Sequence, residues 1–115
     1  MQYMLAVYSD ERAAESTPRE QLTEIINAYM AYTQALRDAK VLVASNRLKP
    51  ASAATAVRTT DGQTKVLDGP FAETKEQLGG YYLIDVPDLD AALSWAKRCP
   101  GARYGTIEVR PIWVM

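Results

Sequence analysis

The sequence predicts an α+β fold, a ferredoxin-like βαββαβ arrangement with an inserted hairpin. Two helical patterns each lie between strand-like segments, in the order strand, helix, strand, hairpin, strand, helix, strand. Right-handed crossovers would place both helices on one face of a single sheet. The length of 115 residues, with 48% apolar and 23% charged residues, indicates one globular domain spanning residues 1–115.

The N-terminal part begins with a strand and continues into a long helix. Residues 2–9 are rich in Tyr, Val and Leu, which is typical of a strand. The segment Thr17–Glu20 predicts a helix start, with Thr17 as its cap in a capping box. Apolar residues at helical spacing extend this helix to about Ala39, and Val41–Ser45 is predicted to be a short strand.

A hairpin and an unusually polar stretch form the middle of the chain. The Asp61-Gly62 pair favours a tight turn between two strands, Thr55–Thr60 and Thr64–Leu67. The following stretch, Asp68–Tyr82, combines turn formers, acids, lysines and a glycine pair. We therefore expect it to form a structured loop that extends from the scaffold and is available for binding. We expect its Ala72–Leu78 part to form one helical turn, ended by Gly79-Gly80.

The C-terminal part repeats the strand, helix, strand order. Tyr81–Val86 is predicted to be a strand, and Pro87-Asp88 favours the capped start of a second helix. Cys99-Pro100-Gly101 is expected to end that helix. The last strand is predicted from about Gly105 to Trp113.

Composition excludes several classes of function. The net charge of −1 provides no basic stripe for a phosphate backbone, so we expect no direct nucleic-acid binding. The N-terminus lacks a basic region and a long apolar run, which argues against a signal peptide or a membrane span. The single cysteine, Cys99, fits a reducing compartment, and we expect a cytoplasmic protein in which this residue is structural.

The pattern of the strands predicts a homodimer. Alternation assigns an apolar set to the sheet face that the helices cover: Tyr3, Leu5, Val7, Ile84, Val86, Ile107 and Val109. The other face would have a mixed set: Met4, Ala6, Tyr8, Tyr81, Leu83, Glu108, Arg110 and Ile112. This second face is too apolar for water, and pairing with a second copy would cover it and enclose its polar members in a cleft. A merely amphipathic exposed face is the alternative.

The chain has no histidine, which restricts any chemistry to other groups. No Ser-His-Asp or Cys-His arrangement and no imidazole metal ligand is available. A general base would have to be a carboxylate, and the candidates are Asp68, Glu73 and Glu108. The spacing of the acids predicts no metal site, and no nucleotide-binding motif occurs, so we expect no cofactor.

The candidate ligand-binding residues are polar or aromatic side chains near the expected cleft: Tyr8, Asp68, Phe71, Lys75, Tyr81 and Arg110. An arginine facing the cleft would bind a carboxylate or phosphate, or alternatively would pair with Glu108. Asp68 would be a base or ligand anchor, or would hydrogen-bond its own turn. Glu73 and Lys75 are alternatively solvated loop charges, and the two tyrosines alternatively pack in the core or an interface.

The chain resembles the DGPF-domain proteins of the YCII-related family over nearly its whole length. The resemblance rests on the stretch Asp68–Glu76, on Gly79–Tyr82 and on the segments Tyr3–Leu5, Val57-Arg58, Ala92–Pro100 and Glu108–Pro111. It implies a dimeric α/β barrel, small, bacterial and cytoplasmic, often encoded beside alternative sigma factors. A His–Asp pair has been proposed as an active site in the wider family, and this chain has no histidine to match it.

Two functions follow as competing hypotheses. In the first, a small dimer binds a small polar or anionic molecule in an inter-subunit cleft, with or without acid–base chemistry by Asp or Glu. In the second, a non-catalytic regulatory module associates with a sigma factor and acts in sigma-factor-dependent transcription. The sequence leaves open whether the protein is an enzyme, and it does not name the ligand.

Overall fold

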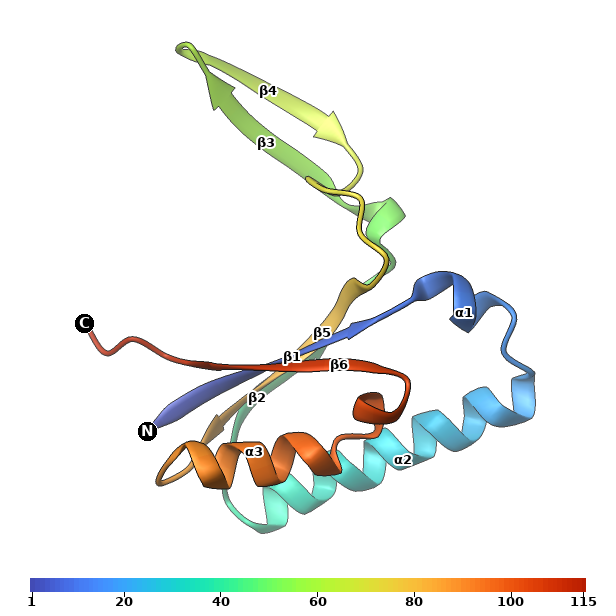
Figure 1. Ribbon diagram of the computed structural model, residues 1–115, viewed down its shortest axis with the longest axis vertical. Coiled ribbons are helices and arrows are strands. Elements are labelled where there is room, and N and C mark those ends of the chain that lie inside the picture. The colour runs from blue at the N-terminus through green and yellow to red at the C-terminus, as the bar shows by residue number, and fades with distance from the viewer.

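Four antiparallel strands form the central sheet of the structure, a computed structural model that describes residues 1–115 (Figure 1). Their order across the sheet is β2-β5-β1-β6, with every neighbouring pair antiparallel. This order is the ferredoxin-like arrangement, so the predicted fold class is confirmed. The strands are β1 (Gln2–Ser9), β2 (Leu42–Arg47), β5 (Gln77–Asp85) and β6 (Gly105–Pro111).

Two helices cover one face of this sheet, α2 (Arg19–Asp38) and α3 (Leu89–Arg98) (Figure 1). Shorter helical segments flank them: α1 (Glu11–Glu15), η1 (Ala51–Ala53) and η2 (Pro100–Arg103). None of the helices combines the length and the apolar character needed to cross a lipid bilayer.

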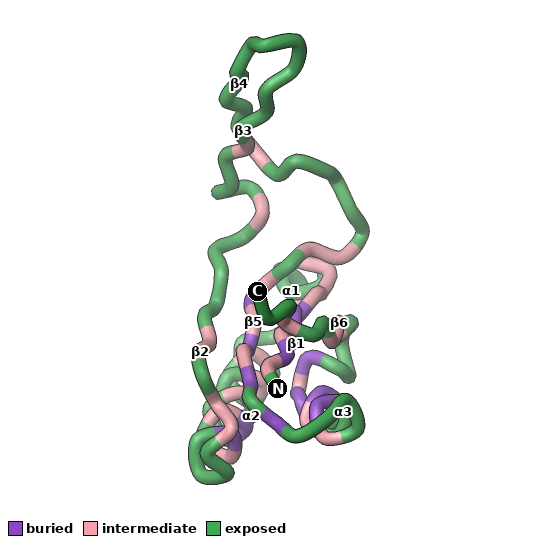
Figure 2. Tube along the Cα trace, turned by 90° about the vertical axis from the view of Figure 1, so that its left-hand side faces the viewer, coloured by how far each residue is buried: buried purple, intermediate pink, exposed green.

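A separate two-stranded hairpin, β3 (Thr55–Thr60) and β4 (Gln63–Asp68), extends away from the sheet on the side opposite the helices (Figure 1). Its turn is the predicted Asp61-Gly62 pair, and both residues have the positive φ that such a turn requires. This hairpin arm, residues 55–68, contains no buried residue (Figure 2).

The hydrophobic core lies between the sheet and the two helices. Leu5, Leu36 and Ile84 are completely buried there, one each from β1, α2 and β5. The predicted helix-covered set is confirmed, because Tyr3, Leu5, Val7, Ile84 and Val86 all belong to the core cluster and Ile107 and Val109 pack against it. Alternation along the strands is therefore sufficient to identify the core face.

Buried tyrosines in this core have their hydroxyl groups satisfied. Tyr32 donates to the carbonyl oxygen of Trp95 at 2.7 Å and meets the ring of Tyr82 edge-on at 5.2 Å. The Thr33 hydroxyl donates to the carbonyl of Tyr29, so the Tyr82 hydroxyl supplies the proton in its 2.9 Å bond to Thr33. Burial raises the pKa of all three phenols, Tyr29, Tyr32 and Tyr82, and they therefore remain neutral.

Cys99 is buried at the C-terminal end of α3, as expected. Burial is the main cause that raises the pKa of its thiol, because the charged thiolate would lose its hydration. The thiol therefore packs as a small apolar group in the core.

The predicted capping box at the start of the long helix is wrong. The N-cap position is Pro18, and no side chain caps the helix. The Thr17 hydroxyl donates instead to the carbonyl of Ala13 at 2.8 Å, because the preceding residues form α1, a helix that the sequence did not predict. Asp10 caps this short helix by accepting from the amide of Arg12.

The predicted helical turn at Ala72–Leu78 is also wrong. No helix forms there, and β5 begins at Gln77, so that Gly79-Gly80 lies inside a strand. Gly79 is the extra residue of a bulge, since Val7 pairs with Gly80 and Tyr8 pairs with Leu78. Pairing with β1 and β2 thus outweighs the local turn preference of this stretch.

The last strand ends earlier than predicted, at Pro111 rather than Trp113. Proline has no amide proton to continue the ladder, and the last backbone contact is the bond from Ile112 N–H to the Gln2 carbonyl at 2.9 Å. Trp113 lies beyond this point and is 87% exposed.

The two glycines of β5 should respond differently to substitution by alanine. A Cβ at Gly80 would lie 2.7 Å from the backbone oxygen of Asn46 and would push β2 away, whereas a Cβ at Gly79 would lie 3.8 Å from the Val7 oxygen. We expect Gly80→Ala to lower the free energy of unfolding by about 1–3 kcal/mol and Gly79→Ala to change it far less. Urea unfolding at one protein concentration measures both, and equal losses would contradict the steric explanation.

Candidate functional site

The sheet face opposite the helices, the open face, has an ordered arrangement of apolar and polar side chains. Residues that pair across antiparallel strands point to the same side of a sheet. Ala6 pairs with Tyr81 on β5 and with Glu108 on β6, which forms one row across three strands. Met4 pairs in the same way with Leu83 and Arg110 in the next row.

Ala6 has the smallest side chain of its row, and its neighbours cover it. Ala6 itself is 1% exposed, while Tyr81 and Glu108 on either side of it are partly exposed. Tyr8 lies one row further along and is also partly exposed. Tyr8, Tyr81, Glu108 and Arg110, all proposed from the sequence, therefore share one surface.

Glu108 and Arg110 form an ion pair on this surface, with 2.9 Å between Oε1 and Nη2. Both side chains remain substantially accessible to solvent, so the pair contributes little to stability. A guanidinium has five N–H donors, and one carboxylate oxygen leaves most of them available to a second acceptor. The ion pair and a ligand-binding role for Arg110 are thus compatible.

The Tyr81 hydroxyl is oriented by a residue that the sequence did not single out. Asn46 on β2 donates from Nδ2 to this hydroxyl at 2.9 Å, which leaves the phenolic proton free for another acceptor. Asn46 lies just beyond the predicted end of its strand at Ser45, while β2 in fact continues to Arg47. The strand alternation could have identified Asn46, because it lies two residues after Ala44 and therefore on the same sheet face. Ala44 is on the open face because it pairs with Leu83.

The other candidates lie on or after the hairpin arm and not on the open face. Asp68 is the last residue of β4 and pairs in register with Thr55, and its exposed carboxylate forms no hydrogen bond, not even with its own turn. Phe71 is 78% exposed, with the guanidinium of Arg58 at 5.7 Å from its ring centroid. Glu73 and Lys75 follow as exposed residues of the return segment, residues 69–76.

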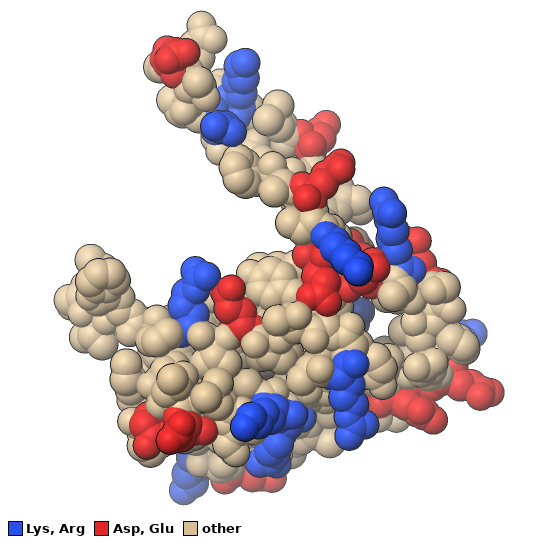
Figure 3. All heavy atoms as spheres, in the orientation of Figure 1, with Lys and Arg blue, Asp and Glu red and all other residues tan.

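The candidate residues therefore form two groups within one chain. Figure 3 shows charged side chains gathered where the arm joins the sheet, and an open hollow between the arm and the C-terminal tail. Glu76 links the two regions, because its Oε1 accepts from the Thr106 hydroxyl on β6 at 2.8 Å. No three Cys, Asp or Glu side chains lie close enough together to hold a metal ion.

The unpredicted helix α1 holds the base of the arm. The amide of Ala51, just before the arm, donates to both carboxylate oxygens of Glu11, at 2.9 and 3.2 Å. The amide of Glu11 donates to Oε1 of Gln77, just after the return segment, at 3.0 Å. Glu11 thus connects the chain that enters the arm with the chain that leaves it, and fixes the direction in which the arm extends.

Comparison with known proteins places the whole chain in one family. A family model described as the YCII-related domain matches residues 1–115. An uncharacterized protein of Rhizobium meliloti (strain 1021) is 40% identical over 114 residues, which cover 97% of this chain and 92% of that protein.

A solved structure shares the fold at low sequence identity. It is the 5-chloro-2-hydroxyhydroquinone dehydrochlorinase from Burkholderia phenoliruptrix AC1100, in complex with 2,5-dihydroxybenzoquinone. The two chains superimpose with a TM-score of 0.53 at 14% identity, over 98% of this chain and 94% of that one. The similarity establishes the fold and leaves the reaction to be argued from the residues of this chain.

Removing the Glu11 carboxylate should loosen the base of the arm. In Glu11→Ala the Ala51 amide loses its acceptor, so we expect faster hydrogen exchange at Ala51 by about tenfold or more. Glu15→Ala is the control, because Glu15 is exposed on the same helix and forms no hydrogen bond through its side chain. Unchanged protection in Glu11→Ala, measured by NMR, would show that other contacts hold the arm.

Proposed function

The chain belongs to the YCII-related family, and from this membership and the geometry of the open face we propose that two copies pair and bind a small polar or anionic molecule between them. The observation on which the proposal rests is the open face itself. It combines apolar side chains such as Met4 and Leu83 with the Tyr81 hydroxyl and the Glu108–Arg110 pair, which is the composition of a ligand site and not of an ordinary protein core.

The exposed area of the single chain supports pairing. A compact protein of 12.7 kDa is expected to expose about 6200 Å². This chain exposes 8608 Å². Its radius of gyration is 16.1 Å, against about 13.4 Å for a compact domain of this length. The excess surface is of the size that a stable interface between two protein chains covers.

The apolar side chains of the arm support the same conclusion. Val57 and Val66, which pair across the hairpin, are each 67% exposed, and Phe71 in the return segment is more exposed still. A two-stranded hairpin is marginally stable in water without a surface to pack on. In the proposed dimer the arm of one subunit extends over its partner and brings Asp68 and Phe71 to the edge of the cleft.

The groups available in the cleft define the class of ligand. Arg110 offers its remaining N–H donors to a carboxylate or another oxygen anion, and Tyr81 offers its phenolic proton. Any proton transfer would be carried out by Glu108 on the open face or by Asp68 or Glu73 near the arm, with Lys75 and Tyr8 as further contacts. Oxygen-rich small molecules such as hydroxy acids and hydroxylated rings fit this set of donors and acceptors.

We expect the protein to sediment as a dimer at micromolar concentration. Leu83→Glu places an unpaired charge at the centre of the proposed interface and should raise the dimer dissociation constant by about a hundredfold or more. Met30→Glu is the matched control. Met30 is 66% exposed on α2, and this helix lies on the other side of the sheet from the proposed interface. A monomeric wild-type protein, or equal effects of the two substitutions, would reject the proposed pairing.

Ligand binding should depend on Arg110 and Tyr81. Calorimetric titration with 2,5-dihydroxybenzoquinone, the ligand of the structural relative, and with glycolate tests a hydroxylated ring and a hydroxy acid. We expect Arg110→Gln and Tyr81→Phe each to weaken binding by about tenfold, because each removes a hydrogen-bond donor to the probe. Lys40→Gln, an exposed cation outside the open face, should leave binding unchanged. The proposed ligand class is wrong if the dimer binds neither probe.

A further inference from the structure

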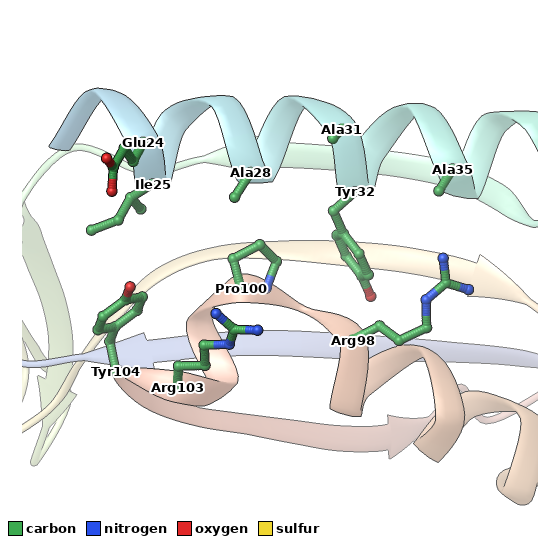
Figure 4. A pocket seen from close by; sticks show the side chains of 10 residues that line it. All are labelled: Glu24, Ile25, Ala28, Ala31, Tyr32, Ala35, Arg98, Pro100, Arg103 and Tyr104. Carbon is green, nitrogen blue, oxygen red and sulfur yellow. The ribbon is translucent and has the colours of Figure 1, made fainter. Parts of the chain in front are cut away.

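We propose a second binding site, in the groove between α2 and the corner where α3 meets η2, for a small molecule that joins a phosphate or carboxylate to an apolar or aromatic part. The groove has a volume of about 460 Å³. Ala28, Ala31, Ala35 and Pro100 form its apolar lining, and Arg98 and Arg103 extend toward α2 from the opposite side (Figure 4).

The charge of the groove favours an anion. Arg98 and Arg103 both line it, and neither forms an ion pair with a carboxylate of the chain. Glu24 is the single carboxylate in the lining and lies toward one end of the groove, beside Ile25 and away from Arg98 (Figure 4). Two guanidinium groups against one carboxylate give the groove a net positive charge, although the whole chain has a net charge of −1.

Arg98 is held in place before any ligand binds. Its guanidinium carbon lies 4.2 Å from the ring centroid of Trp95, a cation–π contact that restricts the long side chain. The Trp95 backbone is in turn fixed by the hydrogen bond from the Tyr32 hydroxyl to its carbonyl, and Tyr32 itself lines the groove. A fixed donor loses less entropy on binding than a free surface arginine.

The rest of the lining specifies the organic part of the ligand. Ala28, Ala31 and Ala35 are small side chains that leave space along this side of the groove, and Tyr104, which is 52% exposed, offers a ring at one end. The volume is within the range of small-molecule sites. An aromatic phosphate or carboxylate would place its anion against the guanidinium of Arg98 or of Arg103 and its ring against Pro100 or Tyr104.

This groove is separate from the cleft of the proposed function. It is lined by residues of α2, α3 and η2, which lie on one side of the sheet (Figure 1), whereas the pairing register places Tyr81 and Arg110 on the opposite face. Both sites are therefore open at the same time, and a molecule in the groove would not compete with a ligand of the cleft.

Titration of the full chain with phenyl phosphate tests the inference. We expect saturable binding that weakens as salt is added, and a loss of about tenfold in affinity for Arg98→Gln and for Arg103→Gln separately. Lys97→Gln is the matched control. Lys97 is next to Arg98 in the last turn of α3 and has the same interaction with the helix dipole, but it lies outside the groove. Its affinity should stay within about twofold of wild type.

Three outcomes would overturn the inference. The first is the absence of saturable binding by the wild-type protein. The second is an equal loss in Lys97→Gln, which would indicate a general charge effect. The third is a loss caused by Arg110→Gln and by neither groove variant, which would place phenyl phosphate in the cleft. Circular dichroism confirms that each variant is folded, and Arg103→Gln provides the test if Arg98→Gln is unstable.

Discussion

The pairing register of β1 with its two neighbours determines which side chains enter the core and which reach the open face. Tyr3, Leu5 and Val7 point toward the helices, so the residues between them, with their partners on β5 and β6, must point the other way. A slip of one residue would expose the core set and bury Glu108 and Arg110 under the helices. The burial of the core therefore fixes the candidate site, although the two share no side chain.

This dependence explains how much the sequence could predict. Alternation along β1 is a local pattern, and it identified the core face and its opposite face correctly. Helical spacing along α2 was only partly right, because it also assigned Ile26 and Met30 to the buried side, and these are 48% and 66% exposed. The local preference of Gly79-Gly80 for a turn was misleading, because the partners that draw it into a strand lie far away in the sequence. The contact of Glu11 with Ala51 spans 40 residues and leaves no periodic pattern, so the helix that contains Glu11 was missed.

The buried titratable groups are on the helix side of the sheet and not in the candidate site. Burial raises the pKa of Cys99 and of the core phenols, so these groups stay protonated and stabilise the interior through packing and hydrogen bonds. Chemistry in the proposed cleft would consequently depend on carboxylates, whose surroundings would change if a second subunit excluded water. Pairing would strengthen the attraction between Glu108 and Arg110, because the screening by solvent is reduced there.

That stronger attraction restricts what the proposed cleft selects. An anion that displaced Glu108 from Arg110 would leave a buried carboxylate without a partner, which costs more than the new contact provides. A ligand that shares the guanidinium and also donates a hydrogen bond to Glu108 avoids this cost, since the five donors of arginine serve two acceptors at once. Molecules with a hydroxyl group beside an oxygen acceptor meet both conditions, whereas simple anions such as inorganic phosphate meet only one. In the proposed dimer, the ion pair that is exposed on the single chain would therefore determine which ligands the cleft selects.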